Sequence, residues 1–362
     1  MNIILTGVTG TLGSQILIQL LKQEKVKNCF LLVREKNGKT PQDRIQNIFH
    51  DIFQNDSNDE MRSKIKIFNS SDFFTPSYLT KTAINYFIHA AGYVNLSIDI
   101  REKAKIFEEN LAFTKKIFQT FSPYLTKFIY ISTAFSIGDV GGFIGNDFHN
   151  GITPKYRNFY EESKHQCEKY LLENEQQSNV SIQILRPSVL GGNISEEPKY
   201  FISKFMVYYL LGKFFYKSPL NGDIVRIVAN FNTGLNIIPV DYVAHVISEA
   251  IHKNIAQLNI THSKCTGLIP GMTRIIETAG ASNFTFVNSV DIQGQLRDKN
   301  RVEQFYYNSL GMHLNPYLVS APYEYDTEVL ESIVPMPSYN LVDYLEDTIS
   351  YAKEKKFRNK RW

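Results

Sequence analysis

The sequence predicts an α/β protein with a doubly wound parallel sheet and a smaller lobe formed mainly by the C-terminal part of the chain. Short apolar runs bounded by turn residues alternate with stretches of helical period over about the first 190 residues. These runs are continuously apolar, as in strands buried on both faces, whereas a half-exposed antiparallel strand would alternate. With 362 residues, the chain can form one large domain with an appended lobe, or two domains.

The predicted strands, in chain order, are NIILT, CFLLV, KIKIF, INYFIH, KFIYIS and IQILRP, and the segments between them are mostly helical in period. Beyond the last of these strands the pattern loosens into longer helical segments, 199–216 and 241–253, and then a polar region. We therefore expect the sheet domain over residues 1–190 and the lobe over residues 191–362, with 239–253 returning to the sheet domain.

Composition excludes some classes of function. Lys and Arg number 39 against 36 Asp and Glu, so the net charge of +3 does not call for a nucleic-acid partner. The N-terminus lacks the features of a signal peptide, and no run reaches the roughly 18 apolar residues of a membrane span, which favours the cytoplasm. Cys29, Cys167 and Cys265 have no metal-binding or redox spacing, so we expect reduced thiols and no metal.

Three glycines directly follow the first predicted strand and open the first predicted helix. Gly7 allows a tight turn, Gly10 removes the side chain that would collide with a pyrophosphate, and Gly13 lets the helix pack close to the strand. The N-terminus of that helix adds N–H donors and the positive end of a dipole. This arrangement predicts a dinucleotide site on a Rossmann-type sheet.

The end of the second predicted strand indicates which dinucleotide binds. Where an NAD enzyme carries Asp or Glu for the ribose hydroxyls, this sequence has Arg34, followed by Glu35. A guanidinium can bind the 2′-phosphate of NADP through two hydrogen bonds. We therefore expect NADPH, with Arg44 as a second contact to the cofactor.

Two further strand ends supply candidate cofactor contacts. Asp72 follows the third predicted strand, at a position that often contacts the adenine in such folds. Ala90, Ala91 and Gly92 follow the fourth, and their small side chains allow the backbone to pass close to the cofactor.

The candidate catalytic groups come from the fifth strand and the helix after it. Ser132 and Thr133 end that strand at the carboxyl edge of the sheet, where open α/β folds bind ligands. Tyr160 and Lys164 lie four residues apart and share a helical face, so the ammonium is expected to lower the phenol pKa. Thr133 and Tyr160 would stabilise a developing alkoxide during hydride transfer, and Lys164 could also bind the nicotinamide ribose.

Simpler interpretations compete with these assignments. A tyrosine and a lysine at this spacing occur by chance on many exposed helical faces, and only the preceding glycine turn and the Ser-Thr strand end favour catalysis. Cys167 is better explained as a core or surface residue, because carbonyl reduction by hydride needs no thiol. His89 is better explained as the end of a buried strand than as a metal ligand.

The motifs TGVTGTLG, STAFSIG, YEESK, RPSVLGG and IIPVDYVAHVI, in this order, resemble the extended short-chain dehydrogenase/reductases over roughly residues 1–255. Within that superfamily, LLVREKNGKTPQDRI, IHAAGYVNLSIDI, ENLAFTKKIF and NFYEESKHQCEKYL resemble the thioester reductase and fatty acyl-CoA reductase branch, with its male sterility-type NAD-binding domain. One departure is Ser71, Asp72 and Phe73, where that branch has Gly-Asp-Leu.

The resemblance implies an NADPH-dependent reductase that converts an acyl thioester, on CoA or an acyl carrier protein, into an aldehyde or further into an alcohol. It implies Thr133, Tyr160 and Lys164 as the catalytic residues. It implies a cofactor site lined by Gly7, Thr9, Gly10, Thr11, Leu12, Gly13, Arg34, Asp72, Ala90, Ala91, Asn110, Pro187 and Val189.

Two rival functions remain at the level of sequence: a nucleotide-sugar epimerase, dehydratase or reductase with the same Thr-Tyr-Lys set, and a non-catalytic cofactor sensor. Two segments have open interpretations. The stretch KFMVYYLLGKFFYKSPL is either core or the lining of an acyl channel or carrier contact, and the basic tail KEKKFRNKRW is either a solvated helix end or a contact with a membrane or carrier protein.

Overall fold

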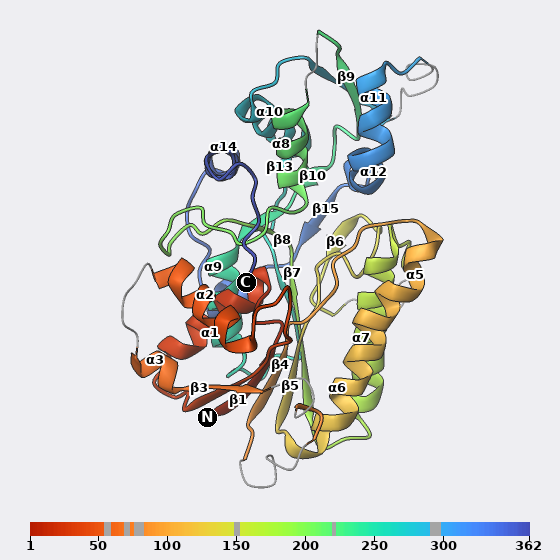
Figure 1. Ribbon diagram of the computed structural model, residues 1–362. Helices are drawn as coiled ribbons and strands as arrows, with labels where there is room; N and C mark the ends of the chain where they lie inside the picture. Colours follow the sequence, from red (N-terminus) through yellow and green to blue (C-terminus); the bar gives the residue numbers. More distant parts are fainter. Residues whose placement is uncertain (54–58, 69–72, 76–82, 148–152, 219–221, 290–297) are drawn as a thin grey trace.

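A seven-stranded parallel sheet forms the centre of the molecule (Figure 1). The computed structural model describes residues 1–53, 59–68, 73–75, 83–147, 153–218, 222–289 and 298–362, and the elements below lie within them. The strand order is β12-β7-β5-β4-β1-β2-β3. The strands are β1 (Asn2–Thr6), β2 (Asn28–Leu32), β3 (Ile65–Phe68), β4 (Tyr86–His89), β5 (Lys127–Ile131), β7 (Ser181–Pro187) and β12 (Gln257–Ile260).

The strand order reverses between β1 and β4, so a crevice opens at their carboxyl ends. The predicted doubly wound sheet is confirmed, and each of the six predicted strands is present within two residues of its expected bounds. The seventh strand, β12, is not predicted by the sequence. Its four residues, QLNI, include only two apolar ones, too few for a periodic signal.

Helices cover both faces of the sheet, which explains why its strands are apolar on both sides (Figure 1). In β1, Ile3 and Leu5 belong to one core and Ile4 to the other, because successive side chains point to opposite faces. The first face carries α1 (Thr11–Lys22), α2 (Pro41–Phe53), α9 (Val240–Ala250) and α13 (Glu328–Ile333), with the short α3 (Asp59–Ser63) near its edge. The second carries α5 (Ile100–Phe107), the π-helical turn η2 (Glu108–Ala112), α6 (Phe113–Phe121), the 3-10 turn η3 (Ser122–Tyr124) and α7 (Phe159–Glu175).

A second layer of structure lies beyond the carboxyl edge of the sheet, at the top of Figure 1. It has its own apolar core, to which α8, α10 and α14 contribute aromatic and aliphatic side chains. Its helices are α8 (Tyr208–Lys217), α10 (Leu268–Ala279), α11 (Arg301–Tyr306), the π-helical turn η5 (Tyr307–Gly311), α12 (Met312–Leu318) and α14 (Leu341–Glu354). Four separate strand pairs lie beyond the main sheet: β6 (Gly142–Ile144) with β15 (Tyr323–Tyr325), β8 (Val189–Gly191) with β11 (Ile237–Pro239), β9 (Val225–Ala229) with β14 (Phe284–Asn288), and β10 (Gly234–Leu235) with β13 (Thr266–Gly267). The β9–β14 pair contributes to the lobe core.

Residues 199–207 are not helical, which corrects the predicted helix over 199–216. Tyr200 and Val207 have positive φ values of 58° and 53°, so the backbone leaves the helical region at both ends of this stretch, and α8 begins only at Tyr208. Its backbone groups bond to distant residues instead: the Phe205 N–H donates to Asn359, and the Ser203 carbonyl accepts from the Lys360 N–H. Local periodicity carries no information about such partners.

The basic tail is not a solvated helix end. Helix α14 ends at Glu354, and the chain then turns through Lys356 and Phe357 with positive φ. Phe357 is buried in the lobe core, and Trp362 packs in the core beside α2. The Trp362 indole N–H donates to Asp51 at 2.6 Å. The tail therefore runs from the lobe back to the sheet domain, as Figure 1 shows for the C-terminus near α1 and α2.

Candidate active site

The glycine turn between β1 and α1 is shaped by close backbone contacts. Gly7 has a φ of +75°, and a Cβ there would lie 2.5 Å from the Ala90 carbonyl at the end of β4. A Cβ on Gly13 would lie 2.2 Å from the Gly7 carbonyl oxygen, so only glycine lets α1 start against the turn. No side chain caps the N-terminus of α1, and no acidic residue lies in its first turn. These open N–H groups fit a bound phosphate, as the sequence predicts.

Arg44 and Arg34 lie beside this turn but have different environments. Arg44 is buried, and its guanidinium donates to the Arg34 carbonyl at 2.6 Å, to Thr9 Oγ1 at 2.8 Å and to the Trp362 carbonyl at 2.8 Å. Burial and the charge of Arg34 lower the Arg44 pKa. The Arg34 side chain is 74% exposed and lies 3.9 Å from Glu109. Arg44 thus fixes the turn and the Arg34 backbone, while the Arg34 guanidinium projects into solvent.

The loop after β4 is held by an amide from the second helical layer. Asn110 is buried in the π-helical turn, where its Oδ1 accepts from the Tyr93 N–H at 2.7 Å and its Nδ2 donates to Ser163 at 2.9 Å. Such turns are frequent at functional sites. Asn110 therefore ties the loop that follows Ala90 and Ala91 to helix α7. Asp72, the predicted adenine contact, lies outside the described residues.

Helix α7 carries Tyr160 in its first turn and Lys164 in its second. Its N-terminus is set by Asn158, whose side chain accepts from the Glu161 N–H at 3.0 Å. Lys164 is 3% exposed, and its Nζ donates to the carbonyl of Ile131, the last residue of β5, at 2.7 Å. The same Nζ lies 4.1 Å from the centre of the Tyr130 ring. The helix is thereby fixed against the strand that ends at Ser132 and Thr133.

Burial is the main cause of the pKa shifts of Tyr160 and Lys164. It lowers the pKa of Lys164 to about 8, and it raises the pKa of Tyr160 above its ordinary value. The lowered tyrosine pKa expected from the sequence is therefore not found: the ammonium is turned toward Ile131, and the loss of solvent around the phenol outweighs its charge. Tyr160 stays protonated at neutral pH, the form that a proton donor needs.

Ser132 and Thr133 have different partners although both end β5. The Ser132 hydroxyl bonds to the buried carboxylate of Glu168, one turn beyond Lys164 on α7. Glu168 also accepts from Ser136 at 2.7 Å and pairs with Arg186 at 2.8 Å, and both members of the ion pair are fully buried. The Thr133 Oγ1 accepts only a 3.3 Å hydrogen bond from the Phe135 N–H among the described residues, so its own proton can be offered to a ligand.

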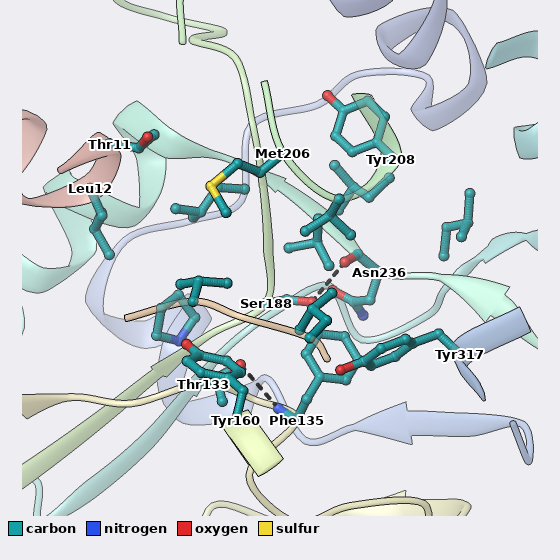
Figure 2. A pocket seen from close by; sticks show the side chains of 18 of the residues that line it. Thr11, Leu12, Thr133, Phe135, Tyr160, Ser188, Met206, Tyr208, Asn236 and Tyr317 are labelled. Atoms are coloured by element: carbon teal, nitrogen blue, oxygen red, sulfur yellow. Dashed lines mark hydrogen bonds between the residues drawn. The ribbon is translucent and has the colours of Figure 1, made fainter. Parts of the chain in front are cut away.

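These groups meet in a cavity of about 310 Å³ between the sheet and the lobe (Figure 2). In this view Thr11 and Leu12 lie toward one end, Tyr317 lies toward the other, and Tyr160 and Thr133 lie between them. Of the predicted site residues, the walls include Gly10, Thr11, Leu12, Gly13, Ala90, Thr133, Tyr160, Lys164, Pro187 and Val189. The walls do not include Gly7, Thr9, Arg34, Arg44, Ala91 and Asn110.

The lobe supplies cavity residues that the sequence did not identify. They are Ile202, Met272, Ile275, Leu314, Tyr317 and Leu318, and they join Lys204, Met206, Tyr208 and Leu211 of the stretch KFMVYYLLGKFFYKSPL, for which the sequence left core and channel lining open. Tyr317 is held by Asn158, whose Nδ2 donates to its hydroxyl at 2.7 Å, and by Arg157 at 5.1 Å from its ring. No local motif marks these positions, because their side chains are brought together only by the tertiary fold. The stretch KFMVYYLLGKFFYKSPL contributes both to the cavity and to the core: Tyr208 and Leu211 line the cavity, and Phe215 lies in the lobe core.

Two residues that the sequence suggested to be structural are indeed buried away from the cavity. His89 ends β4 between the hydroxyls of Thr6, at 2.7 Å, and Thr114, at 3.1 Å, and burial lowers its pKa to about 3. Cys167 is fully buried, and burial raises its thiol pKa. Both imidazole nitrogens of His89 are occupied by these two hydroxyls, and the Cys167 thiol stays protonated, so neither side chain offers a free ligand atom or a thiolate nucleophile.

Comparison with known proteins identifies the family of this chain and its fold. The family model described as Male sterility protein matches residues 5–247. Fatty acyl-CoA reductase 1 of Homo sapiens is 26% identical over 286 residues, which cover 68% of this chain and 53% of that protein. Fatty acyl-CoA reductase 2 of Mus musculus is 25% identical over 232 residues, 54% of this chain and 44% of that protein. The chain spans about half the length of the curated relatives that it matches.

Solved structures share the fold across nearly the whole chain. The reductase domain of an aureusimine biosynthetic cluster superposes with a TM-score of 0.70 at 16% identity, covering 98% of this chain and 90% of that one. The terminal R domain of the myxalamid pathway gives 0.69 at 18% identity, covering 97% and 89%. UDP-glucuronic acid 4-epimerase from Bacillus cereus, in complex with UDP-glucuronic acid and NAD, gives 0.64 at 16% identity, covering 98% and 100%. At these identities the similarity shows the fold.

Proposed function

The chain belongs to the Male sterility protein family, and we propose that it is a nicotinamide-dependent reductase that uses NADPH to convert an acyl thioester into an aldehyde. The observation that carries the proposal is one continuous cavity. It joins the glycine turn, the Thr133, Tyr160 and Lys164 side chains, and an apolar pocket in the lobe. A cofactor at the turn and an acyl chain in the lobe would meet at Tyr160. The similarity to fatty acyl-CoA reductases supports the same chemistry.

The residues of the chain have distinct roles in the proposed reaction. A bound NADPH supplies a hydride to the thioester carbonyl carbon. Thr133 and Tyr160 donate hydrogen bonds to the carbonyl oxygen as it gains negative charge, and Tyr160 transfers its proton to that oxygen. Lys164 holds β5 and α7 together and offers its ammonium to the nicotinamide ribose. The resulting hemithioacetal then loses its hydroxyl proton, the carbon–sulfur bond breaks, and the sulfur leaves as a thiol, so that aldehyde and free thiol are the products.

The lobe end of the cavity favours an acyl chain over a nucleotide sugar. Its walls there include the apolar side chains Leu211, Met272, Ile275, Leu314 and Leu318, and its polar groups, on Tyr208, Asn236, Tyr317 and Ser320, are uncharged. The charged residues among the lining side chains, Lys164 and Lys204, both come from the walls near the cofactor turn. A sugar diphosphate placed there would lose the hydration of its phosphates without gaining a positively charged partner. We therefore propose that residues 191–362 mainly bind the acyl group, although α9 and β12 belong to the sheet domain.

The direct test is a screen of thioesters of graded chain length, on CoA and on an acyl carrier protein, with NADPH oxidation and thiol release followed together. Release of one thiol per NADPH consumed is expected if the product is an aldehyde, and one thiol per two NADPH if reduction continues to an alcohol. Nucleotide sugars form the contrast set, for which we expect neither signal. Cofactor binding without thiol release from any thioester, in a preparation that is folded, would rule the proposal out.

The choice between NADPH and NADH depends on Arg34 in this proposal. Arg34→Ala is expected to raise the dissociation constant for NADPH by roughly tenfold to a hundredfold, because one charge-assisted phosphate contact contributes about 1.5–3 kcal/mol. The constant for NADH should stay unchanged, since NADH has no 2′-phosphate. Fluorescence titration of both nucleotides measures this. Arg101→Ala, which removes another exposed arginine that pairs with Asp99, is the matched control and should affect neither constant. An equal loss of affinity for NADPH and NADH in Arg34→Ala would contradict this role for Arg34.

The pH dependence of the reaction should report on Lys164. Its ammonium form is the one that the proposed mechanism uses, and its pKa of about 8 means that this form is lost as the pH rises through that value. We therefore expect kcat/KM to be level near neutral pH and to fall tenfold per pH unit well above pH ~8. Tyr160 should add no limb in this range, because burial raises its pKa. A profile that stays flat to about pH 10 would remove Lys164 from the mechanism.

A further inference from the structure

Lys204 reaches the cofactor end of the cavity from a part of the chain that is distant from the glycine turn in sequence. It lies in the irregular segment between β8 and α8 and lines the cavity together with Gly10 and Thr11. Its neighbour Ser203 contacts the first residue of α1: the Ser203 and Thr11 hydroxyl oxygens are 3.1 Å apart. Lys204 is therefore placed beside the N-terminus of α1, where the N–H groups of the helix are open.

The charged groups that act on Lys204 are positive, like Lys204 itself. No acidic side chain pairs with its Nζ among the described residues, and its pKa is lowered by burial and then by the positive charges of Lys36 and Arg44. A partly buried ammonium near two other cations costs free energy unless an anion accompanies it. The shape of the glycine turn supplies the place for that anion, because no side chain at Gly10 occupies it.

The tail holds Lys204 in this position from both sides. The residue before it, Ser203, accepts a hydrogen bond from the Lys360 N–H at 2.8 Å, and the residue after it, Phe205, donates to Asn359 Oδ1 at 2.8 Å. The tail is in turn anchored on α2, where Lys360 Nζ and the Trp362 indole both bond to Asp51. These contacts fix the backbone on both sides of Lys204 to the sheet domain, near the glycine turn.

From this placement we propose that Lys204 binds the pyrophosphate of the dinucleotide, opposite the N–H groups of α1, and so makes the lobe part of the cofactor site. The inference rests on the proposed function only in requiring a nicotinamide dinucleotide at the glycine turn. We assign Lys204 to the pyrophosphate rather than the 2′-phosphate because its neighbour contacts Thr11, at the helix N-terminus, whereas Arg34 projects from the end of β2. Lys204 then contributes to the binding of NADPH and NADH alike.

Titration of the protein with NADPH and with NADH, read by nucleotide fluorescence, tests the assignment without any thioester. Lys204→Met keeps the aliphatic stem and removes the charge, and Lys204→Gln keeps a polar end. Both are expected to raise the dissociation constants for the two nucleotides by similar factors of roughly tenfold or more. Lys204→Arg, which keeps the charge, should recover most of the affinity. Lys217→Met, at the exposed end of α8, is the matched control and should bind both as the unmodified protein does.

Several results would overturn the inference. Binding of both nucleotides within about twofold of the unmodified protein would remove Lys204 from the cofactor site, since a charged phosphate contact contributes more than this. Loss of NADPH binding alone would place Lys204 at the 2′-phosphate instead. Thermal unfolding of each variant without nucleotide separates a binding defect from a folding defect. Because no thioester is used, a protein that binds both nucleotides but reduces no thioester would contradict the proposed function and leave this test intact.

Discussion

Tyr160→Phe is expected to lower kcat for thioester reduction by about a thousandfold while leaving the dissociation constant for NADPH nearly unchanged. The phenol is the proposed proton donor to the carbonyl oxygen, and a positioned general acid contributes roughly a hundredfold to ten-thousandfold to a rate. Phenylalanine keeps the ring and its packing and removes only the hydroxyl. For this hydroxyl the structure shows no hydrogen bond to a described residue. Single-turnover NADPH oxidation at saturating thioester measures the effect on the chemical step.

Tyr170→Phe is the control for this change because Tyr170 lies on the same helix, ten residues beyond Tyr160, and packs against Phe118 rather than lining the cavity. We expect its activity to match that of the unmodified protein. If Tyr160→Phe retained more than about a tenth of the activity over a broad set of thioesters, the general-acid role would be wrong. In that case Thr133 and solvent would have to supply the proton.

The local parts of the site were readable from the sequence because each depends on residues close together in the chain. The glycine turn needs Gly7 and Gly13 within one strand-to-helix connection, and the structure shows the close contacts that exclude larger side chains there. The strand end at Thr133 and the helical pair of Tyr160 and Lys164 follow from period and spacing. The structure brings all three into one cavity.

The rest depends on contacts that sequence spacing does not encode. The predicted helix over 199–216 begins only at Tyr208, because the tail supplies hydrogen-bond partners about 150 residues away, as between Phe205 and Asn359. Because of the same contacts, the basic tail is not a solvated helix end but holds the backbone on both sides of Lys204. The expected drop in the Tyr160 pKa also failed, since burial of the phenol is a property of the packed site and not of the Tyr-Lys spacing.

Glu168→Ala is expected to destabilise the fold by about 3–5 kcal/mol, because it breaks a buried ion pair by removing one partner. Glu168 and Arg186 are fully buried and paired at 2.8 Å, so removal of the carboxylate leaves the guanidinium in the core without its counter-charge. The carbonyl of Asn146 and the side-chain oxygen of Gln257, which also accept from Arg186, carry no negative charge. Urea unfolding monitored by circular dichroism measures the loss as a shift of the midpoint at constant slope.

Glu173→Ala is the matched control, because Glu173 lies on the same helix in an exposed pair with Lys169 at 3.9 Å, and such pairs contribute at most about 1 kcal/mol. A loss in Glu168→Ala no larger than in this control would show that the buried guanidinium finds another anion or water. The carboxylate also fixes Ser132 beside Thr133, so the variant should lose activity even under conditions where it remains folded. Glu168→Gln separates the two effects, because its amide oxygen can still accept from Ser132 and Ser136 but carries no charge to pair with Arg186. We expect this variant to lose stability as Glu168→Ala does, but to retain more activity than Glu168→Ala. The same side chain then serves both the fold and the geometry of the strand end on which the proposed chemistry depends.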